Sequence, residues 1–89
     1  MSAERDRQRI DKWLWHARLV RTRGGAAALA GSGHVRVNGA RITAPSRFVR
    51  IGDVITVALE RTVHVLKVKG FTERRGPAKA CEGLYEELV

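Results

Sequence analysis

Few side chains in this 89-residue chain have the chemistry for metal binding or covalent catalysis, and they are widely spaced. The thiol and imidazole groups stand far apart, at His16, His34, His64 and Cys81, without the close ligand spacing of a zinc site. The chain also lacks a P-loop, a Gly-x-Ser-x-Gly elbow and a close carboxylate pair on an apolar frame. We therefore expect no metal, no cofactor and no enzymatic activity.

Arginine is the abundant functional side chain, and its distribution indicates an anionic partner. The formal net charge is +8, and thirteen of the seventeen basic residues are Arg, whose planar guanidinium suits phosphate and base edges. Residues 1–50 hold eleven basic and three acidic residues, which gives 11 − 3 = +8, whereas residues 51–89 hold six of each. The excess charge thus lies in the first half, which favours nucleic acid over a merely anionic surface.

Composition is typical of one small folded domain, with 44% hydrophobic and 29% charged residues. No stretch approaches the roughly 18 apolar residues of a membrane span, and the first residues do not resemble a secretory signal. We expect a cytoplasmic protein with no membrane partner.

The first half of the chain predicts two helices. Apolar residues from Ile10 onward follow the i, i+3, i+4, i+7 spacing of a helix over 9–20. Thr22 is a good N-cap for a second, small-faced helix that Gly31-Ser32-Gly33 would end. Residues 1–8 are polar and read as a flexible arm.

A β-hairpin should follow the second helix, because Asn38-Gly39 separates two alternating segments. A two-residue turn there pairs Val35 with Ile42 on one face. It places Arg36 opposite Arg41 on the other, where two like charges repel unless an anion lies between them.

The remaining segments predict further β-structure and a last helix. Strands are expected over 48–51, 54–59 and 63–68, bounded by turn residues. Cys81, Leu84, Tyr85 and Leu88 have helical spacing after Pro77. The predicted fold is therefore α+β, with two packed N-terminal helices against a small antiparallel β-ribbon. We expect an arm over 1–8, a binding domain over 9–70, and a loop with a C-terminal helix over 71–89.

The two tryptophans differ in their position relative to the apolar face of the predicted helix over 9–20, here called the apolar stripe. Trp13 lies on the stripe and is expected in the core, whereas Trp15 lies off it. Trp15 is open to two interpretations: coverage by the C-terminal helix through Leu84 and Tyr85, or stacking on a base.

Four segments together resemble the S4 RNA-binding domain, in which a helix pair packs against a small β-ribbon. They are Arg9-Ile10-Asp11-Lys12-Trp13-Leu14, Thr22-Arg23, Gly33-His34-Val35-Arg36-Val37-Asn38-Gly39 and Gly52-Asp53-Val54-Ile55. Further similarity, at Trp13-Leu14-Trp15, Arg74-Arg75-Gly76-Pro77 and Leu84-Tyr85-Glu86-Glu87, is to the small stand-alone heat-shock members of that family.

The resemblance implies binding to ribosomal RNA of the large subunit. Family members act on free large subunits that still carry peptidyl-tRNA, in ribosome rescue or ribosome-associated quality control, so peptidyl-tRNA is a further partner that it implies. We expect a monomer off the ribosome. The family's RNA-facing positions fall on Arg9, Lys12, Arg23, Arg36, Asn38 and Arg41, and charge and spacing add Arg18 and Arg21.

Two other functions fit parts of the same pattern. The helix pair could imitate a DNA-binding helix-turn-helix, although no helix offers a clear base-reading surface. The chain could also be a detached targeting domain of an RNA-modifying enzyme. Competition of ribosomal RNA against duplex DNA separates the first from RNA binding.

Overall fold

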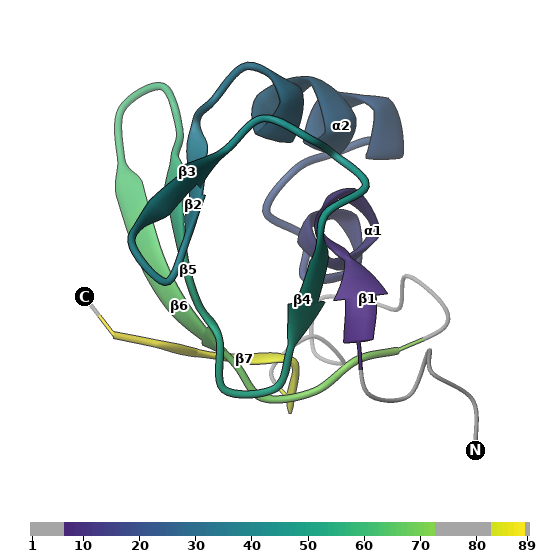
Figure 1. Ribbon diagram of the computed structural model, residues 1–89, viewed down its shortest axis with the longest axis vertical. Coiled ribbons are helices and arrows are strands. Elements are labelled where there is room, and N and C mark those ends of the chain that lie inside the picture. The colour runs from purple at the N-terminus through teal and green to yellow at the C-terminus, as the bar shows by residue number, and fades with distance from the viewer. Residues whose placement is uncertain (1–6, 73–82, 89) are drawn as a thin grey trace.

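Two short helices pack against an antiparallel sheet in the computed structural model, which describes residues 7–72 and 83–88 (Figure 1). In chain order the elements are β1 (Arg7–Arg9), α1 (Ile10–His16), α2 (Arg23–Gly31), β2 (Val35–Val37), β3 (Ala40–Ile42), β4 (Phe48–Arg50), β5 (Val54–Ala58), β6 (Val63–Val68) and β7 (Tyr85–Glu87). Five strands form one sheet in the order β3-β2-β5-β6-β7, and β1 pairs with β4 in a separate ribbon. The α+β class is confirmed.

The core lies between the sheet and the helices. In Figure 1 the sheet runs down the left, α1 lies to its right, α2 above, and the β1–β4 ribbon at the lower right. Helix α1 contributes Ile10, Trp13 and Leu14, all fully buried, which confirms Trp13 as a core residue. Its indole N–H is not left unpaired, because it donates to the Gly70 carbonyl at 3.2 Å.

Helix α1 is shorter than its apolar pattern predicted, because it ends at His16 instead of Val20. Arg18 has a φ of 64°, in the left-handed region, where the helical hydrogen-bond pattern cannot continue. The Arg18 N–H donates to the Trp15 carbonyl and the Leu19 N–H to the Leu14 carbonyl, each at 3.1 Å. These two bonds form a Schellman motif, which usually has glycine at the left-handed position.

The expected arm over 1–8 is wrong at its C-terminal end. Arg7 and Gln8 belong to β1, in register with Arg50 and Val49 of β4. Gln8 is buried, and its side-chain amide donates to the Thr72 carbonyl at 2.7 Å. A polar sequence without a hydrophobic pattern became a strand because β4 supplies its hydrogen-bond partners.

The predicted C-terminal helix is also wrong where the structure describes it. Tyr85–Glu87 is strand β7, which pairs with β6 so that Tyr85 faces Val68. The Tyr85 ring meets the Trp13 ring edge-on, with centroids 6.4 Å apart. In a short segment, the spacing of apolar residues does not distinguish a helix from a strand. Residues 85–87 form a strand because they pair with the otherwise unpaired edge of β6. Pro77 and Cys81 lie outside the described residues.

Trp15 therefore has no C-terminal helix over it within the described part of the chain. Its side chain is half-buried against the core, and its ring lies 5.4 Å from that of His16, measured between centroids. Leu84, the other expected partner, packs with Ala17 instead.

Candidate nucleic-acid interface

The β2–β3 hairpin carries the predicted arginine pair in the predicted register. Asn38 and Gly39 have φ values of 52° and 85°, as a two-residue type I′ turn requires. Arg36 lies directly opposite Arg41, and both are exposed. Among the described residues, no carboxylate lies within ion-pair distance of either guanidinium. The outer face of the hairpin is therefore a cationic site whose internal repulsion a bound phosphate would relieve.

Arg41 connects the hairpin to the end of α2. A Cβ atom placed on Gly33 would lie 3.2 Å from Arg41 Nε and 3.4 Å from Arg41 Cδ. The Arg41 side chain therefore lies across the turn between α2 and β2. Its positive charge is favourable there, because the carbonyl groups at a helix C-terminus carry partial negative charge.

Both polar groups of the Asn38 side chain, the amide oxygen and the amide nitrogen, form hydrogen bonds within the fold. Its Oδ1 accepts from the Val54 N–H at 2.9 Å, and its Nδ2 donates to Asp53 Oδ1 at 3.1 Å. Asp53 Oδ2 in turn accepts from the Arg50 N–H at 2.9 Å. These bonds fix the hairpin against the turn between β4 and β5. RNA contact by Asn38 itself stays a prediction.

Asp53 is a positioning residue that sequence reasoning did not place in the site. Its signal was present, because Gly52-Asp53 belongs to the motif that follows the hairpin. What the sequence did not show is that its carboxylate reaches Asn38, fifteen residues away.

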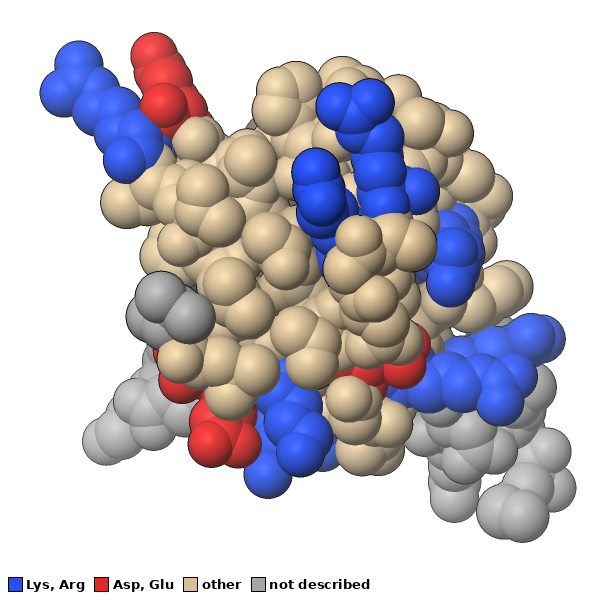
Figure 2. All heavy atoms as spheres, turned by 60° about the vertical axis from the view of Figure 1, so that its left-hand side comes forward, with Lys and Arg blue, Asp and Glu red and all other residues tan. Residues whose placement is uncertain are grey.

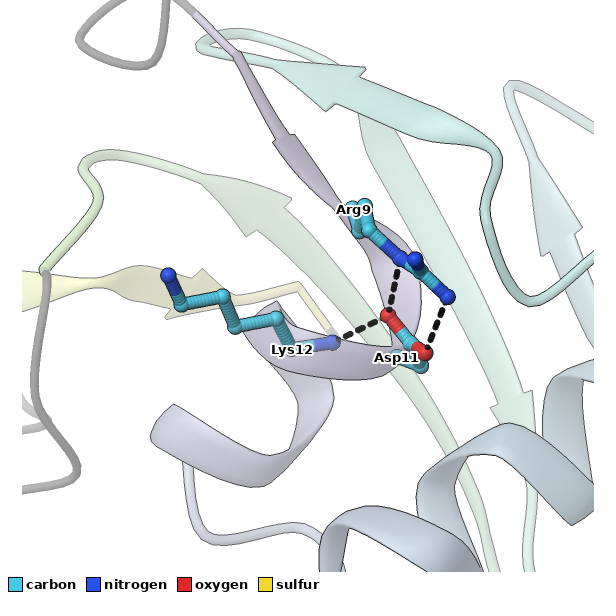
Figure 3. Close-up of polar contacts among 3 residues, drawn as sticks. All are labelled: Arg9, Asp11 and Lys12. Carbon is cyan, nitrogen blue, oxygen red and sulfur yellow. Dashed lines mark hydrogen bonds and ion pairs between the residues drawn. The ribbon is translucent and has the colours of Figure 1, made fainter.

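Arg9 is held in one orientation by a buried carboxylate (Figure 3). Arg9 Nη2 donates to Asp11 Oδ2 at 2.9 Å and Arg9 Nε to Asp11 Oδ1 at 3.1 Å. The Asp11 side chain is 4% exposed and that of Arg9 is 43% exposed, so the ion pair has one buried and one accessible end. Asp11 Oδ1 also accepts from the Lys12 N–H at 2.7 Å. The two hydrogen bonds to Asp11 orient the Arg9 guanidinium and leave its outer part accessible.

Lys12 is not brought beside Arg9, although the two are three residues apart. Figure 3 shows its half-buried side chain pointing away from the Arg9–Asp11 pair. With the side chains in these positions, Lys12 and Arg9 do not bind the same phosphate.

The turn from α1 to α2 gathers three of the predicted residues. Arg18, Arg21 and Arg23 are all exposed there. Thr22 between them is the N-cap of α2, as predicted, because its hydroxyl accepts from the Gly25 N–H at 2.9 Å. Helix α2, which lies between this turn and the segment that leads to the hairpin, has nine residues and is about 13 Å long at 1.5 Å per residue. The predicted site thus forms two groups, one toward each end of α2, with Arg9 on β1 and Lys12 on α1 outside both.

Basic side chains are unevenly distributed over the sheet side of the molecule. Figure 2 shows most Lys and Arg side chains from the centre to the right of that view, whereas the left-hand part is chiefly uncharged, apart from basic and acidic side chains at its upper and lower edges. In the sheet order, the hairpin with Arg36 and Arg41 lies at one end, whereas β7 at the other end carries Glu86 and Glu87. The charge excess of the first half of the sequence is therefore also a spatial asymmetry.

Residues 7–72 and 83–88 contain no group of three His, Cys, Asp or Glu side chains placed to hold a metal ion. No helix within them is long and apolar enough to cross a membrane.

Comparison with known families gives a match over the region that carries this surface. The family model described as the S4 domain matches residues 8–55. Heat shock protein 15 of Escherichia coli K12 is 39% identical over 81 residues, covering 91% of this chain and 60% of the relative. Small ribosomal subunit protein uS4 of Rhodopseudomonas palustris TIE-1 is 38% identical over 72 residues, covering 79% of this chain and 35% of the relative.

A solved structure supports the same comparison for the whole fold. A structure of heat shock protein 15 from Vibrio cholerae, described as trimeric, superposes with a TM-score of 0.87 at 33% identity. It covers 94% of this chain and 84% of that chain. The chain spans about 60% of the length of the heat shock protein 15 relative from Escherichia coli.

Proposed function

This chain belongs to the S4-domain family and is homologous to heat shock protein 15, and from that premise we propose that it binds ribosomal RNA of the large subunit. The S4 domain and its heat shock protein 15 relatives are RNA-binding, non-catalytic families. The proposed target is the free large subunit that still carries peptidyl-tRNA after failed translation. The proposed role is ribosome rescue or quality control in the cytoplasm, without enzymatic activity.

One observation carries the RNA-binding part of this proposal. Arg36 and Arg41 lie opposite each other on an exposed hairpin, and Arg41 extends toward α2. Such a pair binds phosphate through charge and geometry, without reading a base sequence. Double-stranded RNA is recognised in this way, through its shape, its phosphates and its 2′-hydroxyl groups.

Competition between nucleic acids tests the RNA preference. A labelled fragment of large-subunit ribosomal RNA is bound to the protein and displaced by unlabelled RNA or by duplex DNA of equal length. We expect RNA to compete at least tenfold better than DNA. Equal competition would instead favour the helix-turn-helix interpretation, in which α2 enters the major groove.

Sucrose-gradient fractionation tests the ribosomal part. Extracts are compared with and without a translational stall, and the protein is followed by immunoblot. We expect the stall to move it into fractions that hold free large subunits with peptidyl-tRNA. Recovery only in the ribosome-free top fractions, under both conditions, would contradict the rescue role while leaving RNA binding intact.

A further inference from the structure

The β1–β4 ribbon has an outward face of which the predicted site includes Arg9 alone. In both strands the middle residue points inward, since Gln8 is 7% exposed and Val49 is fully buried. Side chains alternate along a strand, so the flanking residues share the other face. That outward face consists of Arg7, Arg9, Phe48 and Arg50.

This face repeats the charge pattern of the hairpin. Arg7 lies directly opposite Arg50 in the ladder, as Arg36 lies opposite Arg41. Like charges in directly opposed positions destabilise a strand pair. No carboxylate of the described residues lies within ion-pair distance of Arg7 or Arg50. An anion between the two guanidinium groups would remove the repulsion, as at the hairpin.

An exposed aromatic ring, that of Phe48, lies on the same face as these arginines. Phe48 is 44% exposed, although a Phe side chain gains about 2 kcal/mol or more from full burial. The Arg7 guanidinium carbon lies 4.2 Å from its ring centroid, which is a cation–π contact. Aromatic rings and guanidinium planes are the two surfaces on which proteins stack unpaired nucleobases.

We propose that the outward face of the β1–β4 ribbon is a second RNA-binding site, which holds one unstacked base of a single-stranded segment against Phe48 and Arg7. The adjacent phosphate lies between Arg7 and Arg50. This inference rests on the proposed RNA-binding function and extends it from shape recognition of structured RNA to capture of a single-stranded segment.

The ribbon is directly connected to helix α1 through Arg9, a residue of the predicted site. Arg9 belongs to the outward face of β1, and Asp11 fixes its guanidinium. Helix α1 begins at the next residue, and the Ile10 N–H donates to the Arg47 carbonyl at 2.7 Å, just before β4. Arg9 thus stands where the ribbon meets the helices.

A pair of variants at Phe48 isolates the stacking interaction. Phe48→Leu keeps an apolar side chain but removes the aromatic face, whereas Phe48→Trp keeps and enlarges it. The probes are a fluorescein-labelled single-stranded RNA 12-mer and the same 12-mer with abasic riboses, read by anisotropy. We expect F48L to lose about fivefold or more in affinity for the complete RNA, the size of one stacked base, and nothing for the abasic one. F48W should bind at least as tightly as the parent chain.

Charge variants and controls complete the test. The double variant Arg7→Gln with Arg50→Gln should weaken both probes, because it removes phosphate contacts. Ile51→Ala, at a neighbouring side chain that is 59% exposed, and Arg61→Gln, in the turn between β5 and β6, should change neither. Circular dichroism and thermal unfolding establish that every variant is folded.

The outcomes separate this site from the hairpin site. If F48L binds the complete RNA like the parent chain, or weakens both probes equally, the stacking site is refuted. Loss of binding in a double variant Arg36→Gln with Arg41→Gln would then still support the proposed function. If the parent chain binds neither the 12-mer nor ribosomal RNA, both proposals fail. Binding to phosphatidylserine vesicles that F48L abolishes, without an effect on RNA, would reassign the face to a membrane surface.

Discussion

The two helices end in the same backbone motif but with different residues at its left-handed position. In α2 this position is Gly33, with a φ of 83°, and the bonds from Gly33 and His34 return to Ala30 and Leu29. In α1 it is Arg18, with a φ of 64°. An L-residue with a side chain is disfavoured there by about 1–2 kcal/mol relative to glycine.

The difference teaches which constraint acts at each helix end. At Gly33 the left-handed φ favours glycine, and a Cβ would lie 3.2 Å from Arg41 Nε, so that side chain would have to shift slightly. At Arg18 the fold tolerates backbone strain and retains a long cationic side chain on an exposed turn. Strained residues that persist in a fold tend to lie at functional sites. We therefore propose that Arg18 contributes its charge to RNA binding, at the expense of stability.

The largest expected effect is that of Gly33→Ala. The new Cβ meets the left-handed penalty and displaces Arg41, so the free energy of unfolding should fall by about 1–2 kcal/mol. Urea denaturation of both proteins measures it. RNA affinity should fall slightly as well, because the Arg41 side chain has to shift away from the new Cβ. An unchanged denaturation midpoint would show that the turn relaxes and that the comparison with Arg18 is mistaken.

Thr22→Ala tests the start of α2, next to the Arg18 turn. It removes the hydroxyl that accepts from the Gly25 N–H, which should cost about 1 kcal/mol of stability. Thr22→Ser is the matched control, because it keeps the cap. If the two variants unfold at the same urea concentration, the cap does not stabilise α2.

The smallest expected effect has the opposite sign. Arg18→Gly should raise the free energy of unfolding by up to about 1 kcal/mol, since it relieves the left-handed strain, while it weakens RNA binding. Arg18→Ala is the control that removes the charge but keeps the strain. Equal RNA affinities for the two variants, with only the glycine variant stabilised, would support the interpretation. A stabilised R18G with undiminished RNA binding would contradict it.

Local signals in the sequence were sufficient for the parts of the fold that are fixed by neighbouring residues. Asn38-Gly39 predicted the turn, its register and the Arg36–Arg41 pair, because a two-residue loop leaves one alignment. Thr22 predicted the N-cap of α2, because a threonine hydroxyl accepts a hydrogen bond from a free N–H of the first helical turn. Trp13 was assigned to the core from the spacing of the apolar stripe.

The parts that were missed depend on distant partners or on strain. Gln8 lies in a polar segment, and only β4 makes it a buried strand residue. Tyr85 is a strand residue because β6 has a free edge. Arg18 gives no sequence signal for a helix end, since glycine is the residue expected there. The outward face of the β1–β4 ribbon was not predicted because β1 itself was not predicted. Arg7 and Phe48 are 41 residues apart and come into contact only because β1 pairs with β4.

The salt dependence of RNA binding tests the central claim most directly. Affinity for a large-subunit ribosomal RNA fragment is measured from low to high salt for the parent chain, for Arg36→Gln with Arg41→Gln, and for the control Arg61→Gln. If the hairpin pair contacts phosphates, the double variant should bind more weakly, and its slope of log affinity against log salt should be shallower by about 1.5. R61Q should match the parent. A double variant with the parent's affinity and slope would contradict the account.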